Sequence, residues 1–452
     1  MRVRRRDIRE NTKLLTGILA AGAFSAITLL GSRLCSHEND SKQPRPATAG
    51  QTTSASPTST GLWVIPTSNF RTIGRRYFES GNFDDGQFTQ VMRFDSGDLL
   101  LFGGNRDSIL ITKTHADGTV MWSRQMRNRG SNYLGRELAT GAVEMPDGTP
   151  IVIGCTERPN GPYAMPRYHG LVMRFGHDGS TTWTRRLQGE TNAPAPIEQL
   201  LESDECVLAV TRSSDNNLFV ATRRHYVPMP GQTPPPYTQV AVYKLNAQNG
   251  STMWSGTLST DLYPRRIFQV TADTATVFGS GADDYPRVSD VNMGTLSSPT
   301  FFQPVSGQIL QLTQLQTGGF IGTGGISEAP RLVRFDQNMQ ISWERTYPCP
   351  YSGLSSFHAV PVHNPEGFFA LGLCRGNSDG GETRFNRGVR VDANGNRTSE
   401  FAFPNNMDVM DAVGFADGSI GIVGSIVVGR GRFAHRDPLY GRISRDTSLN
   451  GR

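Results

Sequence analysis

Short apolar runs alternate with turns rich in Asp, Asn and Gly along most of the chain, and one such pattern recurs. Residues 171–183 read LVMRFGHDGSTTW, and related segments occupy 111–122 (ITKTHADGTVMW), 242–254 (VYKLNAQNGSTMW) and 332–343 (LVRFDQNMQISW). Each has an apolar run, a basic residue, a turn and a Trp. The pattern predicts a β-hairpin that is repeated along the chain.

The hairpin forms the second half of a longer unit. In the unit 139–188, GAVEM is a first strand, Pro146-Asp147-Gly148 a turn, IVIGC a second strand and 156–168 a loop that leads into the hairpin. The same order fits six further units: 87–126, 197–259, 265–305, 307–348, 356–403 and the segment from 408 onward, although 265–305 retains only the first half clearly. The sequence therefore predicts seven units of four strands.

Four-stranded units of this length are typical of β-propeller blades, because a lone sheet of this size leaves both faces unburied. The last unit ends before a fourth strand, and Trp63, the only Trp outside the repeats, is expected to supply that strand. We predict an all-β, seven-bladed propeller over residues 61–452, closed by an N-terminal strand near Trp63. An open β-solenoid or a two-domain sandwich is the alternative.

The basic residue of the hairpin keeps its spacing to the Trp. Lys113, Arg174 and Arg334 precede their Trp by nine positions, and Lys244 precedes Trp254 by ten. Because the residue recurs in every clear unit, we expect it to have a structural role such as pairing across blades.

The two ends of the propeller are expected to differ. Turns between strands one and two, and between three and four, are tight, and strand alternation places them on one face. The long connections fall on the other face, where loops on a rigid scaffold commonly carry function. We predict that a partner binds there through residues assigned to those loops: Arg158, Arg167, Tyr168, Arg223, Arg224, Tyr226, Arg384, Arg387, Arg430 and Arg432.

Arginine and tyrosine are enriched at interface hot spots, so this face would suit a protein, or an anionic or glycan-like polymer. The alternative is that these loops contain arginine only because the whole chain does, since nearly all of its basic residues are arginine and its only lysines are Lys13, Lys42, Lys113 and Lys244.

The N-terminal region has the pattern of an export segment. Residues 1–13 are Arg-rich, residues 14–30 carry no charge, and residues 36–60 are rich in Ser, Thr and Pro. We interpret 1–35 as a signal peptide or membrane anchor and 36–60 as a flexible linker. Cys35 leaves lipidation open. The propeller is expected in the periplasm or at the cell surface of a bacterium, as a monomer that is tethered by this segment or secreted after cleavage.

Charge and cysteine content exclude several classes of function. The net charge of +5 comes mostly from residues 1–13, so nucleic acid binding is not indicated. The five cysteines show no metal-site spacing, and Cys155 is expected to be a small buried side chain. An exported protein could contain one or two disulfides whose pairing the sequence leaves open. We expect no metal and no cofactor.

Catalytic constellations are not evident. The adjacent carboxylates Asp84-Asp85 and Asp283-Asp284 are of a kind that glycosidases or calcium sites use, but they are interpreted as solvated loop residues. No set of His, Asp and Ser follows from spacing, and we assign no catalytic residue.

The repeats, above all KLNAQNGSTMW at 244–254, resemble those of quinoprotein-type (PQQ-repeat) propellers, in which a Gly shortly precedes a Trp that packs between blades. The resemblance covers residues 61–452 as architecture. It departs from the dehydrogenases of that class, since there is no adjacent Cys-Cys pair, the length is short of eight blades with insertions, and the middle unit matches poorly. It implies a fold and no activity.

The sequence thus favours a binding or scaffolding propeller of the bacterial cell envelope. An exported hydrolase or lyase with its site at the central opening is the alternative. Converging carboxylates or histidines at the axis would favour the enzyme, and an Arg/Tyr face with an apolar or water-filled axis would favour the binding protein.

Overall fold

The computed structural model describes residues 63–64, 70–72 and 87–443, apart from gaps at 105–107, 128–136, 159–166, 188–200, 229–236, 259–261, 269, 282–285, 294, 297–299, 302–307, 316, 327–328, 348–356, 364–365, 379–380, 405 and 429–434. By contacts the chain divides into two units, 1–57 and 58–452, and every described residue belongs to the second. The predicted export segment, Cys35 and the linker lie outside the described residues. Within the described part, no helix is long and apolar enough to cross a membrane.

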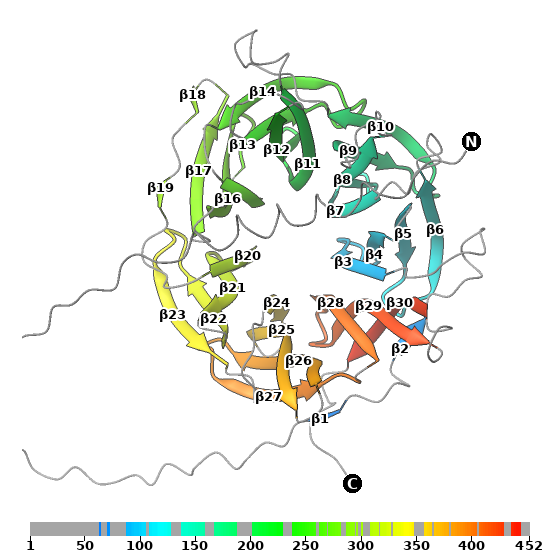
Figure 1. Cartoon of the computed structure of the whole chain (residues 1–452), viewed down its shortest axis with the longest axis vertical. Helices are drawn as coiled ribbons and strands as arrows, with labels where there is room; N and C mark the ends of the chain where they lie inside the picture. Colours follow the sequence, from blue (N-terminus) through cyan, green and yellow to red (C-terminus); the bar gives the residue numbers. More distant parts are fainter. Residues whose placement is uncertain are drawn as a thin grey trace, which may run out of the picture. The chain divides into compact units, whose positions relative to one another are not determined.

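Seven sheets are arranged in a ring, as Figure 1 shows. The first three blades have their strands in chain order from the centre outward: β3 (Gln87–Arg93), β4 (Leu99–Gly104), β5 (Ser108–Thr114) and β6 (Val120–Arg127); β7 (Glu137–Glu144), β8 (Pro150–Arg158), β9 (Arg167–Phe175) and β10 (Thr181–Leu187); β11 (Leu201–Arg212), β12 (Leu218–Pro228), β13 (Tyr237–Leu245) and β14 (Thr252–Leu258).

The remaining blades follow the same plan, and three of them have short strands at the outer edge. They consist of β15 (Leu262–Phe268), β16 (Thr274–Gly281), β17 (Pro286–Asn292), β18 (Thr295–Leu296) and β19 (Thr300–Phe301); β20 (Gln308–Gln314), β21 (Phe320–Ile326), β22 (Ala329–Phe335) and β23 (Ile341–Thr346); β24 (Phe357–His363), β25 (Glu366–Ser378), β26 (Gly381–Asp392) and β27 (Arg397–Ala402); β28 (Met407–Gly414), β29 (Ile420–Val428) and β30 (His435–Ile443). The predicted seven-bladed, all-β propeller is confirmed.

An N-terminal strand closes the ring, as predicted, but Trp63 is not in it. Strand β2 (Phe70–Thr72) pairs antiparallel with β30 and is the outermost strand of the last blade. Trp63 lies in β1 (Trp63–Val64), which pairs in parallel with β27 of the preceding blade. Residues 70–72 (FRT) have little apolar character, so the sequence pattern does not identify them as a strand. The prediction therefore placed the closing strand at Trp63.

The hydrophobic core lies between the blades. Among the described residues, seven clusters of buried apolar side chains are present, and each joins two consecutive blades around the ring. Strands β4 and β5 are buried along their whole length because blades cover both faces of the sheet. This two-sided burial explains apolar runs without strict alternation, such as LLLFGG.

The repeated Trp packs on the hairpin of the next blade. A Cβ added to Gly179 would lie 2.6 Å from the Trp122 ring, and one added to Gly250 would lie 2.8 Å from the Trp183 ring. The indole Nε1 of Trp183 also donates a hydrogen bond to Ala247 O at 3.1 Å. The glycine of the turn is therefore required both by its positive φ and by the ring that covers it.

The repeated basic residue connects its own blade to the next one, as predicted. Arg174 pairs with Asp147 of its own blade and donates to Ala247 O of the following blade at 2.9 Å. Lys244 pairs with Asp215 at 2.7 Å and donates to Ala272 O of the following blade at 2.6 Å.

A β-bulge recurs in six of the seven innermost strands. The register shifts at Phe88/Gln90, Ala139/Gly141, Val207/Ala209, Pro264/Arg266, Ile309/Gln311 and Val409/Asp411. In four blades a glycine of the second strand faces the bulge. A Cβ on Gly154 would lie 2.0 Å from Leu138 O, and one on Gly424 would lie 1.8 Å from Asp408 O. The glycine that ends the apolar second strand in the sequence thus makes room for the bulge.

A disulfide joins two blades in the described part of the chain. Cys155 of β8 bonds to Cys206 of β11, with Cα atoms 4.9 Å apart and 51 positions between the residues. Cys155 is buried, as predicted, but it is a disulfide partner and not a lone apolar side chain. The pairing could not be found from the sequence because no local spacing links the two cysteines.

Candidate functional site

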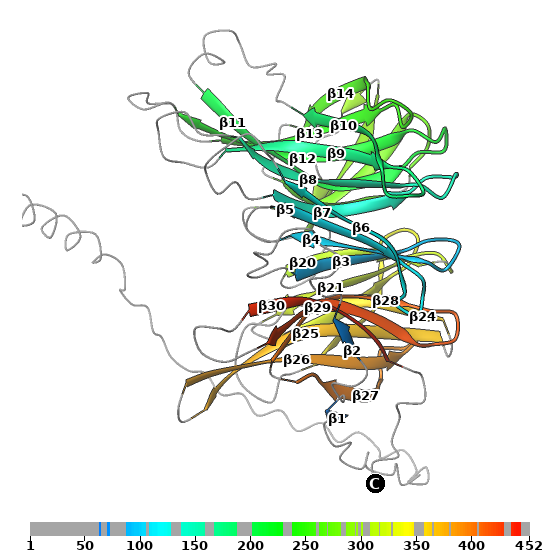
Figure 2. The same ribbon diagram turned by 90° about the vertical axis from the view of Figure 1, so that its right-hand side faces the viewer.

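The two faces of the propeller differ as the repeat predicts. The tight turns gather at one end of the strands in Figure 2, where Asp side chains accept hydrogen bonds from backbone N–H groups two positions later, as Asp147 does from Thr149 and Asp417 from Ser419. At the opposite end, the strand pairs β11–β12 and β25–β26 extend beyond the other strands (Figure 2). We call this end the loop face.

The residues that the sequence predicted to bind a partner are mostly in strands and not in loops. Arg158 ends β8; Arg167 and Tyr168 begin β9; Arg223, Arg224 and Tyr226 lie in β12; Arg384 and Arg387 lie in β26. Arg430 and Arg432 are outside the described residues. The loop assignment was wrong because β12 and β26 run for 11 and 12 residues, well past the apolar part of the blade.

Arg224 is buried within its own blade. It is 3% exposed, and its Nε lies 3.2 Å from Glu205 Oε1. That oxygen also accepts hydrogen bonds from Thr222 Oγ1 at 2.6 Å and from the Tyr243 hydroxyl at 2.9 Å. Burial, together with the Glu205 charge, raises the pKa of Tyr243, so the phenol stays protonated. Arg224 accordingly holds the blade together.

Arg387 has the same kind of role in another blade. It is 1% exposed, pairs with Glu400 at 2.6 Å and donates to Tyr347 O at 3.2 Å. Of the ten predicted residues, these two are therefore not presented to a partner on the surface. The side chains of Arg158, Arg167, Tyr226 and Arg384 are not described.

A central cavity of about 1370 Å³ lies on the axis of the ring. It is lined by the innermost strands β3, β7, β11, β15, β20 and β28. Two of the predicted residues, Tyr168 and Arg223, line it as well. The cavity therefore connects the strands that carry the repeated bulge to part of the predicted binding surface.

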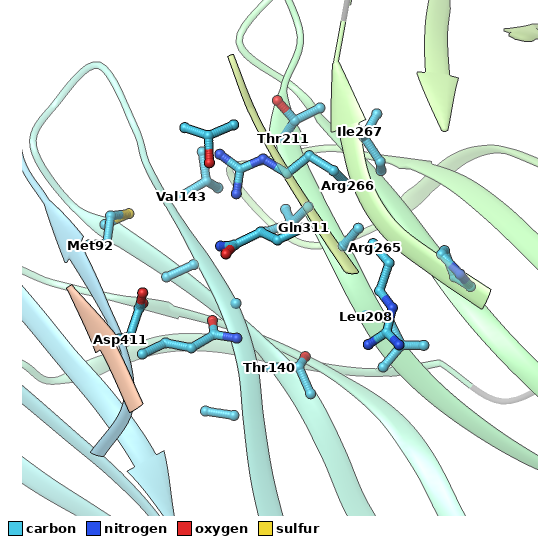
Figure 3. Close-up of a pocket in the computed structure, with 18 of the residues that line it drawn as sticks. Met92, Thr140, Val143, Leu208, Thr211, Arg265, Arg266, Ile267, Gln311 and Asp411 are labelled. Atoms are coloured by element: carbon cyan, nitrogen blue, oxygen red, sulfur yellow. The ribbon is translucent and has the colours of Figure 1, made fainter. Parts of the chain in front are cut away.

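Two consecutive arginines enter this cavity from β15. The bulge between Pro264 and Arg266 interrupts strand alternation, so that both Arg265 and Arg266 face the axis. Figure 3 shows that their guanidinium groups diverge: Arg265 extends toward Leu208, and Arg266 extends toward Thr211 and Val143. The corresponding residues of β3, Thr89 and Gln90, are neutral.

Tyr263 holds two arginines beside the loop-face end of the cavity. The guanidinium carbon of Arg265 lies 4.2 Å from the centre of the Tyr263 ring, and that of Arg223 lies 4.7 Å from it. Stacking on an aromatic ring fixes the plane of each guanidinium group and directs its N–H edges away from the ring. We call Arg223, Tyr263 and Arg265 the mouth cluster.

Deeper in the cavity, Asp411 and Gln311 face Arg266 from other blades. Asp411 accepts hydrogen bonds from Val91 N at 3.0 Å and Ala412 N at 2.8 Å. The Oε1 atom of Gln311 is buried and has no hydrogen-bond partner among the described residues. Burial lowers the pKa of Arg266, and the Asp411 charge opposes that shift. Arginine remains charged in such surroundings.

A second charged group lies at the turn-face end. Glu144 Oε2 accepts a hydrogen bond from Asp95 N at 2.7 Å, and Arg212 donates to Glu144 O at 3.4 Å. Burial raises the pKa of Glu144, and the Asp95 charge adds to the effect. This group joins two neighbouring blades at the end of β3 and β7.

The described residues of the cavity do not form a cluster of metal-ligating side chains. Among the described residues, no three His, Cys, Asp or Glu side chains are grouped for one, and no histidine lines the cavity. From the sequence, converging carboxylates or histidines at the axis would indicate an enzyme, and an Arg/Tyr face with an apolar or water-filled axis would indicate a binding protein. The cavity matches neither description fully, because it is polar and Arg-rich and has one carboxylate midway along it.

Sequence reasoning missed the cavity residues Tyr263, Arg265, Arg266, Gln311 and Asp411. Alternation alone would point only one of Arg265 and Arg266 inward, so the bulge had to be known first. The one available signal was the Arg-Arg pair within YPRRIF, because the five other units that contain the bulge carry no basic residue at the equivalent positions.

No family model matches the sequence, and no curated protein matches it. The structure is similar to a streptogramin B lyase (11% identity, 83% of this chain and 99% of that one, TM-score 0.46) and to virginiamycin B lyase from Staphylococcus aureus (10%, 79% and 96%, TM-score 0.44). It is also similar to the NanB sialidase from Streptococcus pneumoniae (11%, 84% and 71%, TM-score 0.43). These similarities concern the fold alone.

Proposed function

We propose that the protein is an exported binding propeller of the bacterial cell envelope, which recognises an acidic protein or polymer through the loop-face end of its central cavity. The observation that carries the proposal is the mouth cluster, in which Tyr263 orients Arg223 and Arg265. An oriented guanidinium loses little conformational freedom on binding and can contact an oxyanion with two N–H groups.

The contrast between the faces supports this choice. On the turn face, the Asp residues are engaged by their own turns and by the basic residue of the same blade, as in Asp417 with Ser419 and Arg442. Charges that are satisfied internally offer little to a partner. Arg223 has a buried Nε without a hydrogen-bond partner among the described residues.

Export is part of the proposal. The Arg-rich and apolar N-terminal pattern suggests it, and the Cys155–Cys206 disulfide suits an oxidising compartment. We further propose that the segment tethers the propeller to the membrane. Membership of the quinoprotein-like propellers is proposed from the repeated Gly and Trp only.

Affinity purification of the full-length chain from its native membranes tests the binding role. The variant Arg223→Gln/Arg265→Gln should lose the co-purified envelope component, because it removes both charges of the mouth cluster. The matched control is Arg185→Gln/Arg186→Gln, which removes two exposed charges from the outer strand β10. Equal recovery of the component by the wild type and the mouth variant would argue against the proposal.

A hydrolase or lyase is the second candidate, and Asp411 is the observation that favours it. Its carboxylate is fixed by two backbone N–H groups and faces a cavity that a substrate could enter. Turnover of an envelope polymer by the wild type, with loss of turnover in Asp411→Asn at unchanged stability, would support the enzyme.

A further inference from the structure

Arg266 differs in charge from the residues at the equivalent bulge position of the other innermost strands. Those at the equivalent bulge are Gln90, Gly141, Ala209, Gln311 and Asp411, none of which is a cation. The bulge recurs with neutral and acidic residues at this position, so forming it does not depend on a positive charge there. The cation at position 266 is therefore unexplained by the fold.

The guanidinium of Arg266 has no hydrogen bond or ion pair with the described residues. The side chain of Arg266 is accessible to solvent within the cavity. Because protein surrounds the cavity, desolvation lowers the pKa of the guanidinium group. Asp411 interacts with it electrostatically without forming an ion pair. A charge held in such surroundings is stabilised by an oxyanion that forms hydrogen bonds with it.

A second unsatisfied polar group lies on the next blade. Gln311 is in β20, which neighbours β15, and its buried Oε1 has no partner within the described part of the chain. Arg266 and Gln311 both extend into the cavity in Figure 3. A side-chain amide beside a cation can contact a hydroxyl group of a ligand whose acidic group binds the cation.

The dimensions and lining of the cavity restrict the ligand further. Its volume of about 1370 Å³ exceeds the roughly 300–1,000 Å³ of pockets for drug-sized molecules. Gln90, Thr211 and Gln314 add amide and hydroxyl groups to the lining. A polar ligand longer than a small metabolite fits these properties better than an apolar one.

We propose that the cavity binds an acidic oligosaccharide or polysaccharide end, with its oxyanion group on Arg266 and a neighbouring hydroxyl on Gln311. The inference rests on the proposed function, because such a ligand enters past the mouth cluster, and it adds the chemical class and a second contact site. The acidic group is a carboxylate or a phosphate, both of which guanidinium groups bind.

Calorimetric titration of the full-length protein tests the proposal with three probes: an oligogalacturonide of four to six units, a neutral malto-oligosaccharide of the same length, and inorganic phosphate. We expect saturable binding of the acidic oligosaccharide and none of the neutral one. Arg266→Gln should weaken binding by about 10- to 100-fold, the contribution typical of a hydrogen-bonded charge. Arg266→Lys should retain part of the affinity, and Arg186→Gln should leave it unchanged.

The outcomes separate this inference from the proposed function. The inference alone is overturned if the mouth variant no longer captures the membrane component but Arg266→Gln still binds the oligogalacturonide as the wild type does. Tight Arg266-dependent binding of phosphate but not of the oligosaccharide overturns the carbohydrate assignment, as does equal binding of the neutral sugar. Binding of none of the three probes overturns the site. Unfolding midpoints of all variants show whether a loss reflects the site or the fold.

Discussion

Buried arginines in this protein stabilise individual blades, and Arg224 is the clearest case. It shares Glu205 with Thr222 and Tyr243, and both ion-pair partners are at most 3% exposed. Such a pair contributes less than its attraction suggests, because desolvation offsets much of it. Removing one partner alone is costly, since the other charge stays buried.

We expect Arg224→Met to lower the free energy of unfolding by about 3 kcal/mol, because it leaves Glu205 charged and unpaired. The double variant Arg224→Met/Glu205→Met should recover part of that loss. Urea unfolding of both variants and of the exposed control Arg186→Met measures the effect. A double variant that is less stable than the single one would contradict this explanation.

The aspartates of the turns make the free energy of unfolding depend on pH. Burial alone would raise the pKa of Asp417 and Asp147, but hydrogen bonds from Ser419 and Thr149 and the charges of Arg442 and Arg174 lower it below 3.8. Asp215 shifts the same way through Lys244. A carboxyl with a lowered pKa stabilises the fold above its unfolded pKa, and this stability is lost as the pH falls through 3.8 and below.

The urea concentration at the unfolding midpoint should therefore decrease when the pH is lowered from 6 to 3. In Asp417→Asn this decrease should be smaller. Glu144 acts in the opposite direction, because its raised pKa gives stability at low pH that is lost as the pH rises through its folded pKa. Glu144→Gln should consequently gain stability relative to the wild type at pH 7. Parallel urea curves at both pH values provide the measurement.

At the scale of a strand pair, backbone contact requires the glycine that faces the bulge in four of the blades. A Cβ at Gly154 would lie 2.0 Å from Leu138 O, an atom that cannot rotate away. Gly97 differs, because it has a positive φ of 89° and a Cβ added there would have no atom within 4 Å.

We expect Gly154→Ala to destabilise the protein by more than about 3 kcal/mol, since accommodating the methyl group requires backbone movement. Gly97→Ala should cost only about 1 kcal/mol, which is the strain of a left-handed alanine. Thermal and urea unfolding compare them. Similar losses for the two variants would show that the bulge tolerates a side chain.

The sequence was sufficient for the strands and turns but not for their irregularities. The Asp-Gly turns and the Trp spacing predicted the blades because each reflects local geometry that recurs. The bulges depend on register between strands, which alternation does not reveal, and so Arg265 and Arg266 went unnoticed. Likewise, Arg223 and Arg224 occupy a polar extension of β12 that reads as a loop when strands are recognised by apolar runs.

For the whole molecule, closure depends on a three-residue strand far from its partner in sequence. Strand β2 pairs with β30 through Phe70, Arg71 and Thr72, whereas β1 adds only Trp63 and Val64 to another blade. The last and first blades also meet in a core that includes Tyr440, whose hydroxyl donates to Ala116 O at 2.8 Å.

Two truncations distinguish the contributions of these strands. Removing residues 1–79 deletes β1 and β2, with five paired residues in all, and should lower the free energy of unfolding by about 5 kcal/mol, assuming about 1 kcal/mol for each paired residue. Removing 1–67 deletes only β1 and should have a smaller effect. Both are made under the same oxidising conditions and compared by urea unfolding. If the 1–67 truncation were the less stable of the two, β1 with Trp63 would contribute more to closing the ring than β2.

The repeated bulge also bears on how the protein could acquire new ligands. At four of the bulges, two adjacent residues, such as Thr89 and Gln90, line the cavity while the neighbouring residues maintain the interfaces between blades. Substitutions at these paired positions would alter the chemistry of the cavity, although Thr140 also donates a hydrogen bond to Val207 O of the next blade. The bulges thus provide positions at which the lining of the cavity differs from blade to blade, and Arg265-Arg266 in a single blade makes that lining asymmetric in charge.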